Sequence, residues 1–151
     1  MKLRMVSGIS PEFAPFGKVI SAPRGVDLPN WAREVFRSTY PEVSELEVKT
    51  LELGQMSSKD YTRLEIHYKS PQAFVITKGK IAVPVAAERH GSKVIFVEGE
   101  ANSVIFVNPG IWHGGPFALA DASLLVLLAK GTGESDTIKQ PLEEPIVAEV
   151  C

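Results

Sequence analysis

The chain has 151 residues, about the length of one domain, and its 44% hydrophobic and 23% charged residues are typical of a soluble globular protein. Its formal net charge of −2 gives no electrostatic reason to expect nucleic acid or a membrane surface as a partner. No apolar run is long enough to span a bilayer, and the first residues lack the apolar segment of a secretory signal. The single cysteine, Cys151, cannot form an internal disulfide, so we expect a cytoplasmic protein.

The N-terminal part of the chain carries the helical signals. Ser10, Pro11 and Glu12 have the pattern of an N-cap followed by a first helical turn, so we predict a short N-terminal helix that ends at Gly17. Residues 23–41 have a mixed pattern with a helical piece around residues 31–36. We interpret this stretch as a lid or a dimer arm.

The rest of the chain has the pattern of an all-β domain. Short runs rich in β-branched residues are separated by turn residues, and they lie at 48–53, 62–67, 73–77, 81–86, 93–97, 103–107 and 123–128. Many short strands with almost no helix between them favour an antiparallel sandwich or barrel over a parallel sheet. From about residue 133 to 151 the sequence is polar and rich in proline, so we expect a surface tail on a single domain.

One predicted strand has polar side chains where a core strand would have apolar ones. Because side chains alternate along a strand, four of them are predicted to share one face: Tyr61, Arg63, Glu65 and His67. Leu64 and Ile66 would then need cover on the other face. Burying charge is costly unless the groups pair, bind a metal or face a wet pocket. The polar row therefore either lies at a wet sheet surface or forms part of a site.

The spacing of these residues favours a site. The chain contains the patterns E-x-H-x4-Q-x6-G and, further on, G-x2-H, formed by Glu65, His67, Gln72 and Gly79 and by Gly110 and His113. The first resembles the first cupin motif, H-x-H-x3/4-E-x6-G, and the second resembles the core of the second cupin motif. This resemblance implies a cupin-type double-stranded antiparallel β barrel (jelly roll) and a homodimer.

A closer resemblance is to the ureidoglycolate lyase (ureidoglycolate hydrolase) family. It rests on the order of LEIHYKSPQAFVITKG, a strand pair and GIWHGGPFAL, with FGKVI near the start, and it extends from residue 13 to about residue 132. It implies a C–N lyase of purine and allantoin catabolism that cleaves a small ureido hydroxy acid to glyoxylate and urea. Where the family has YHRGVWHH, this chain has VNPGIWHG, so Val107, Asn108, Pro109 and Gly114 replace polar residues of the family.

The candidate site residues fall into two groups. Glu65, His67, Gln72 and His113 offer a carboxylate, two imidazoles and an amide, which suit a divalent metal such as Ni, Mn, Fe or Zn. Without a metal, Glu65, His67 and His113 would serve as acid and base, and Gln72 would orient a substrate carbonyl or amide. A small carboxylate substrate is expected to contact a further set: Arg63, Gln72, Tyr61, Trp112 and Lys69.

Several of these residues also have simpler explanations. Arg63 either binds the substrate carboxylate, pairs with Glu65 or is solvated. Trp112 also fits the core, and His90 fits a solvated loop. Two further functions remain open beside the lyase. One is another metal-dependent cupin enzyme that acts on a small hydroxy or keto acid, and the other is a non-catalytic small-ligand binder.

Overall fold

The computed structural model describes residues 5–7, 10–88 and 93–149, so that His90 and Cys151 lie outside the described residues. The N-terminal elements are β1 (Met5–Ser7), β2 (Gly17–Ser21) and α1 (Leu28–Thr39). The barrel continues with β3 (Leu46–Leu53), β4 (Ser58–Ile66), β5 (Gln72–Ala86), β6 (Ile95–Glu100), β7 (Ser103–Val107), β8 (Trp112–His113) and β9 (Phe117–Ala129). The last elements are α2 (Thr132–Ser135) and β10 (Ile138–Glu149).

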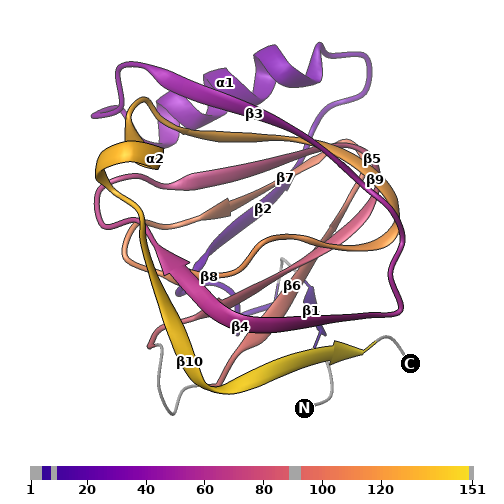
Figure 1. Ribbon diagram of the computed structural model, residues 1–151. Helices are drawn as coiled ribbons and strands as arrows, with labels where there is room; N and C mark the ends of the chain where they lie inside the picture. The colour runs from indigo at the N-terminus through magenta and orange to yellow at the C-terminus, as the bar shows by residue number, and fades with distance from the viewer. Residues whose placement is uncertain (1–4, 8–9, 89–92, 150–151) are drawn as a thin grey trace.

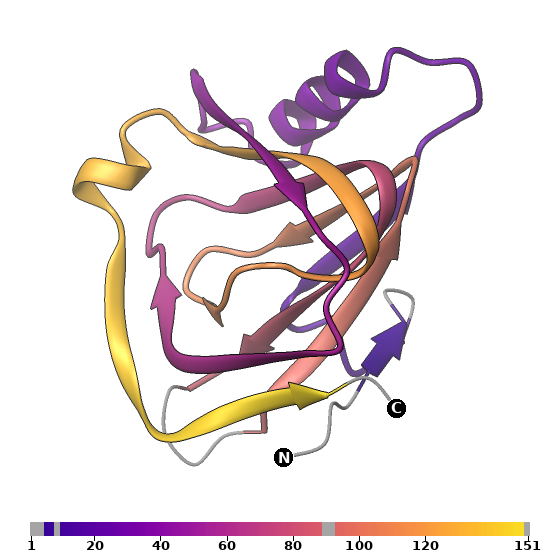
Figure 2. The same ribbon diagram turned by 45° about the vertical axis from the view of Figure 1, so that its right-hand side comes forward.

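The strands form one ten-stranded sheet with two branches that share β5, the longest strand. One branch has the order β1-β6-β5-β8-β4-β10, and the other joins β2, β7, β5, β9 and β3. All of these pairs are antiparallel except β1 with β6. Figures 1 and 2 show the strands wrapped around one interior. The predicted double-stranded antiparallel β barrel is therefore confirmed.

A glycine lies in the irregular stretch of β5, between the parts of the strand that pair with β7 and with β6. The pairing of β5 with β9 shifts register between Ile76 and Ile81, and Gly79 lies inside this irregular stretch with φ of 82°. A β-carbon at Gly79 would lie 2.1 Å from the backbone oxygen of Asp121. Only glycine combines this backbone conformation with so close an approach of another strand.

Apolar side chains form three clusters around the sheet. The first fills the barrel interior and includes Phe74, Ile76 and Ile105, all fully buried. The second lies between the sheet and α1, where Phe36 contacts Phe106. The third covers the outer face of β5 and β6 with residues of β4 and β10. Leu64 belongs to the third cluster, so its cover comes from the chain itself.

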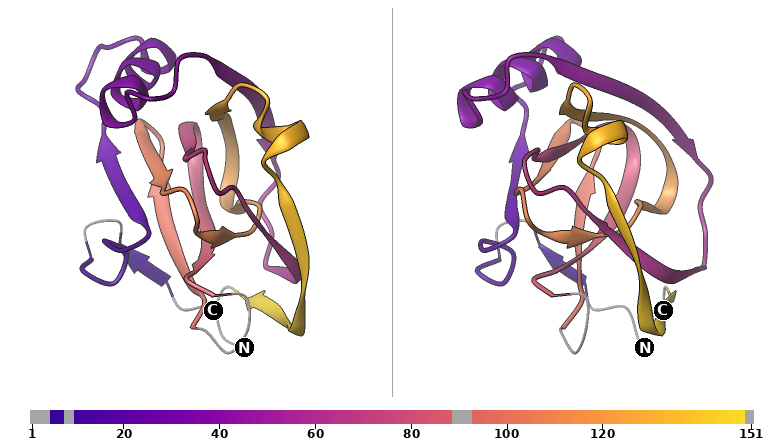
Figure 3. Two further views of the ribbon diagram at one scale, coloured as in Figure 1. Left: turned by 90° about the vertical axis from the view of Figure 1, so that its left-hand side faces the viewer. Right: turned by 60° about the vertical axis from the view of Figure 1, so that its left-hand side comes forward.

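The helix α1 is not a lid over the site. Asp27 caps its N-terminus by accepting a hydrogen bond from the Asn30 N–H, and Pro29 lies in its first turn. Its buried face packs on the outer side of the sheet, away from the barrel interior (Figures 1 and 3). Within the described residues, neither helix is long and apolar enough to cross a membrane.

Two sequence-based expectations about the ends of the domain need correction. Residues 11–16, predicted as a short helix, form consecutive turns with bonds such as Phe16 N–H to Phe13 O. Pro15 has no N–H with which to continue a helix from the first turn. The segment from residue 133, expected to be a surface tail, is largely exposed but ordered. It forms most of α2 and then β10, which pairs with β4 at residues 138–141 and 146–149 and is irregular between them.

Candidate functional site

Three strand ends bring the two sequence motifs together. Glu65 lies near the end of β4, Gln72 begins β5, and His113 on β8 pairs directly with Glu65. His67 follows β4, and its carbonyl accepts a hydrogen bond from the Gly110 N–H at 2.7 Å. Gly110 has φ of 80°, so the turn before His113 uses the backbone freedom of glycine. The loop of the second motif is thereby tied to the first.

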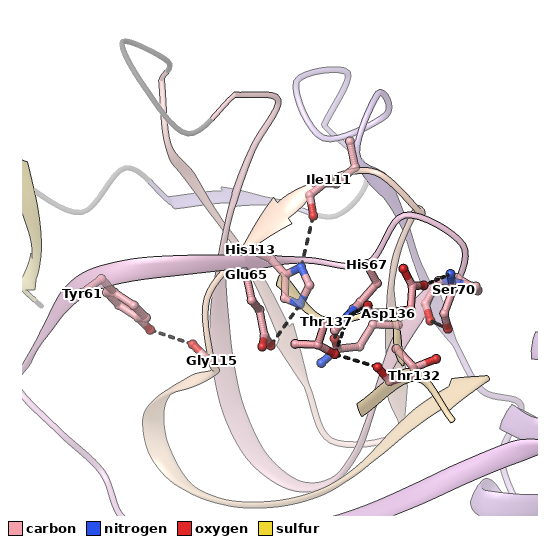
Figure 4. A network of polar contacts seen from close by, with 12 residues as sticks. Tyr61, Glu65, His67, Ser70, Ile111, His113, Gly115, Thr132, Asp136 and Thr137 are labelled. Carbon is pink, nitrogen blue, oxygen red and sulfur yellow. Dashed lines mark hydrogen bonds and ion pairs between the residues drawn. The ribbon is translucent and has the colours of Figure 1, made fainter. Parts of the chain in front are cut away.

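The side chains of these residues meet in one cluster. One ligand atom from each of Glu65, His67 and His113 lies within 4.8 Å of the others. His113 Nε2 is 3.3 Å from Glu65 Oε1, and His67 Nε2 is 2.8 Å from Gln72 Oε1. Both imidazoles are almost fully buried, and their ring centroids are 5.0 Å apart (Figure 4). These three residues are spaced so that they could hold a metal ion.

Backbone carbonyls determine which ring nitrogen of each histidine carries the proton. His113 Nδ1 lies 3.2 Å from the Ile111 carbonyl, and His67 Nδ1 lies 2.9 Å from the Asp136 carbonyl. A carbonyl oxygen only accepts, so both Nδ1 atoms donate. The Nε2 atom of each neutral ring then keeps its lone pair, which points into the cluster.

The atoms that face one another in the cluster are acceptors. Among the described residues, His113 Nε2 is buried without a hydrogen-bond partner, and it lies 3.3 Å from the carboxylate oxygen of Glu65, which is also an acceptor. His67 Nε2 likewise faces the amide oxygen of Gln72. Paired acceptors are unfavourable in a buried site unless a proton or a cation lies between them. Two imidazoles, a carboxylate and an amide therefore fit a divalent cation.

Glu65 is ionised in this environment. When the His113 ring carries a proton on Nε2, its hydrogen bond to Glu65 lowers the pKa of the Glu65 carboxyl below the ordinary value, and the charges of a protonated His67 and of Lys139 act in the same direction. Partial burial opposes this shift but does not outweigh it. An ionised carboxylate is the form that ligates a metal.

The cluster opens into a cavity of about 360 Å³, which we call the barrel pocket. Its wall is apolar on the side of β3, β5 and β9, where Leu51, Phe74, Val126 and Leu128 lie. Lys49 and Lys139 supply positive charge, and Thr137 supplies a hydroxyl. The barrel pocket is therefore suited to a small molecule with an anionic group and an apolar part.

A second, smaller cavity of about 160 Å³ adjoins the cluster, and we call it the rim hollow. Glu65, Gly115 and Lys139 line both the rim hollow and the barrel pocket. Arg63 lines only the rim hollow and is exposed. Arg63 therefore lies beside the cluster but does not reach into the barrel pocket.

Three residues expected at the site lie elsewhere. Tyr61 is buried in the outer cluster with Leu64, where the pairing of β4 with β10 shifts register, and its hydroxyl donates to the Gly115 carbonyl at 2.7 Å. It supports the loop after His113 but does not line the barrel pocket. Trp112 packs against the same outer cluster. Lys69 lines a separate surface hollow of about 450 Å³, larger than the barrel pocket but without the ligand cluster.

The structure also explains two of the departures from the family motif. A β-carbon at Gly114 would lie 2.8 Å from both the Pro84 and Tyr61 side chains, so a histidine does not fit at this position without rearrangement. Asn108 accepts a hydrogen bond from the Tyr40 hydroxyl at 3.1 Å. Asn108 thus ties the loop to the end of α1 and does not enter the barrel pocket.

Sequence reasoning missed the site residues that come from outside the motifs. Lys49 is one of several exposed residues of β3, and nothing in its spacing distinguishes it. Asp136, Thr137 and Lys139 belong to the segment expected to be a tail. Lys139 pairs in register with Glu65, so β10 brings it to the site.

Comparisons with known proteins address the fold. No protein-family model and no curated protein sequence matches the chain. Among solved structures, a 3′-monoepimerase from Streptomyces bikiniensis in complex with dTDP-quinovose has a TM-score of 0.50 and 21% identity, over 69% of this chain and 56% of that chain. Oxalate decarboxylase from Bacillus subtilis has a TM-score of 0.49 and 14% identity, over 68% of this chain and 26% of that chain.

A 3,4-ketoisomerase from Helicobacter canadensis also matches, with a TM-score of 0.46 and 16% identity over 61% of this chain and 66% of that chain. The matched region is thus less than two thirds of each of these three proteins. At these identities the likeness concerns the fold alone. The strand order and the likeness to the 3′-monoepimerase show that the chain has a jelly-roll β barrel of the cupin type.

Proposed function

We propose that the protein is a metal-dependent enzyme that acts on a small carboxylate substrate. The observation that carries this proposal is the buried cluster in which His113 Nε2 has no hydrogen-bond partner and faces the Glu65 carboxylate. We further propose, from the resemblance of its motifs to those of ureidoglycolate lyases, that the reaction is cleavage of a ureido hydroxy acid to glyoxylate and urea.

The proposed metal ligands are Glu65, His67 and His113, with Gln72 as a fourth. The mixed nitrogen and oxygen donors suit Ni, Mn, Fe or Zn and do not select one of them. When bound, such an ion would act as a Lewis acid toward an oxygen of the substrate. As a ligand of the ion, the Glu65 carboxylate is not free to act as a general base, a role that it would have only without a metal.

Two lysines are placed to hold the substrate carboxylate. Lys49 and Lys139 come from β3 and β10 and both line the barrel pocket, whereas Arg63 lines only the rim hollow. An ammonium group binds a carboxylate by charge-assisted hydrogen bonds. We therefore assign the primary carboxylate contact to the lysines and a secondary one to Arg63.

The proposed reaction transfers one proton and breaks one bond. The substrate hydroxyl loses its proton, its oxygen becomes the carbonyl oxygen of glyoxylate, and the electrons of the C–N bond pass to the urea nitrogen, which gains a proton. The described side chains would hold the carboxylate at the lysines and the ureido group beside Gln72. The apolar wall of the barrel pocket would limit the access of water to the reacting carbon.

One observation favours a second candidate. Ureidoglycolate is polar along its whole length, whereas one wall of the barrel pocket is formed by Leu51, Phe74, Val126 and Leu128. A hydroxy or keto acid with an apolar side chain would match this wall better. A different metal-dependent cupin reaction on such an acid is therefore the alternative.

The test is an assay of purified protein, stripped of metal and reconstituted separately with Ni, Mn, Fe and Zn. Urea and glyoxylate are measured with ureidoglycolate as substrate, and a panel of small hydroxy and keto acids is assayed in parallel. Release of urea in equal amount to glyoxylate, lost in a His113→Gln variant, supports the proposed lyase. Turnover of another acid without urea release selects the alternative. Binding of acids without any turnover overturns both and leaves a small-ligand binder.

A further inference from the structure

The turn between α2 and β10 contacts His67 through two oxygen atoms. The Asp136 carbonyl lies 2.9 Å from His67 Nδ1, and the Thr137 hydroxyl lies 3.2 Å from the same nitrogen (Figure 4). The Thr137 hydroxyl donates its own proton to the Thr132 carbonyl at 2.8 Å, so it accepts from His67. Both partners of Nδ1 are therefore acceptors, and the proton of the neutral ring lies on Nδ1.

The side chain of Asp136 fixes the backbone that follows His67. Its carboxylate accepts hydrogen bonds from the N–H groups of Tyr68 at 2.9 Å, Lys69 at 2.9 Å and Ser70 at 3.0 Å. One residue thus holds both the ring nitrogen of His67 and the three residues after it.

The carboxylate is ionised, which strengthens these bonds. Burial of Asp136 acts in the opposite direction, but the backbone N–H groups of Lys69, Tyr68 and Ser70 outweigh it and keep the pKa of Asp136 below its ordinary value. The Asp136 N–H in turn donates to the Thr132 carbonyl at 3.0 Å, which fixes the turn itself. The position of the Asp136 carbonyl is therefore fixed by the hydrogen bonds of the Asp136 carboxylate and by that of the Asp136 N–H.

We propose that Asp136 is a positioning residue for His67. It holds the ring in one orientation and one tautomer, with the Nε2 lone pair directed at Gln72 and the rest of the cluster. The consequence for metal affinity rests on the proposed function, whereas the orientation and the tautomer do not. Partners of this kind, one shell outside a metal ligand, set the basicity and direction of the ligand.

The first test needs no variant. Two-bond ¹H–¹⁵N correlation spectra of metal-free wild-type protein at about pH 8, where an ordinary imidazole is neutral, report the tautomer of each histidine. We expect His67 to carry its proton on Nδ1, as does His113, whose Nδ1 faces the Ile111 carbonyl. A His67 ring protonated on Nε2 overturns the proposal at once.

The second test compares variants. Asp136→Ala removes the carboxylate that accepts three hydrogen bonds, so the backbone carbonyl of residue 136 is no longer fixed beside His67 Nδ1. We expect the Nδ1-protonated fraction of His67 to fall while the His113 signals stay unchanged. Asp136→Asn keeps one acceptor oxygen and is the milder variant if the alanine variant does not fold. Thr137→Val should leave the tautomer in place, because the Asp136 carboxylate still fixes the Asp136 carbonyl beside His67 Nδ1.

The matched control is Asp121→Ala. Asp121 is an exposed aspartate whose carboxylate, like that of Asp136, accepts a hydrogen bond from a backbone N–H, that of Gln55 at 2.8 Å, and it lines neither the barrel pocket nor the rim hollow. Its removal should leave the His67 tautomer as in the wild type. An unchanged tautomer in the folded Asp136 variants, or an equal change in Asp121→Ala, contradicts the proposal.

A cobalt titration of the same proteins separates this inference from the proposed function. If the metal site is real, Asp136→Ala should lower the affinity for Co²⁺ by about 10- to 100-fold, the usual effect of losing such a partner. If the wild-type protein binds no Co²⁺ and Asp136→Ala nevertheless changes the His67 tautomer as expected, the metal proposal is refuted and the role of Asp136 is supported. Unchanged Co²⁺ affinity in a folded Asp136→Ala variant refutes the role in metal binding.

Discussion

Two parts of the same barrel interior differ in how they are filled. Around Gly99 the interior is so closely packed that an added β-carbon would lie 2.8 Å from the Ile76 side chain and 2.9 Å from that of Ile105. At the other part, the barrel pocket leaves about 360 Å³ open beside Glu65 and His67. The first part stabilises the fold, and the second holds the polar groups.

The strand β5 shows how one pattern produces both parts. Gln72, Phe74 and Ile76 follow each other at alternate positions, and they lead from the metal-ligand cluster through the pocket wall to the packed interior. Only the chemistry of the inward side chain changes along the strand. Mutations in the two parts should therefore have separable effects on stability and on activity.

The largest expected effect is on stability, in the packed part. Ile105→Ala should lower the free energy of unfolding by about 2–5 kcal/mol, because it leaves a cavity at a fully buried position. Urea unfolding measures this change. The variant should bind metal as the wild type does at temperatures where it remains folded.

The matched variant Ile105→Val should cost only about 0.5–1.5 kcal/mol. If Ile105→Ala remains folded but loses metal binding, the packed part of the interior also affects the site, and the expected separation of stability from metal binding is wrong.

The second effect is on activity, in the open part. Glu65→Gln keeps the size of the side chain but removes its charge, so turnover should fall by about 10²-fold or more. The free energy of unfolding should change little, since removing the charge also relieves the cost of burying it. Initial rates and a urea unfolding curve on the same preparation measure both. Full activity in Glu65→Gln would exclude both the ligand role and the base role.

The third and smallest effect concerns substrate binding. Lys139→Ala should raise the KM for a carboxylate substrate by about tenfold at nearly constant kcat, because a hydrogen bond to a charged group contributes about 1.5 kcal/mol or more. Arg63→Ala should raise KM at most about fivefold, as expected for an exposed ion pair. Steady-state kinetics of the two variants measure both changes. A larger increase in KM for Arg63→Ala than for Lys139→Ala would refute the assignment of the primary carboxylate contact to the lysines.

The sequence was sufficient for the features that depend on local spacing. Alternation and the two motifs predicted the barrel, and they selected Glu65, His67, Gln72 and His113, which the structure brings together. The alternation is a property of any extended strand, so these side chains could be assigned to one face without coordinates. Tyr61 was the exception, because the β4–β10 pairing shifts register beside it.

The sequence was not sufficient for groups that reach the site through long-range pairing. Lys139 reaches Glu65 because β10 returns along β4, and Asp136 reaches His67 across almost seventy residues of chain. The segment that carries them contains Pro141 and Pro145, which made it resemble a surface tail. Composition does not reveal which strand such a segment pairs with, since pairing partners are fixed by the whole sheet.

The most direct test of the account is the metal content of the protein. Metal-stripped wild-type and His113→Gln proteins are equilibrated with Ni, Mn, Fe or Zn, dialysed and analysed by mass spectrometry. The account predicts that the wild type retains about one divalent ion per chain and that His113→Gln retains far less while remaining folded. A wild-type protein that retains none of these metals, or a His113→Gln variant that retains as much as the wild type, would contradict it.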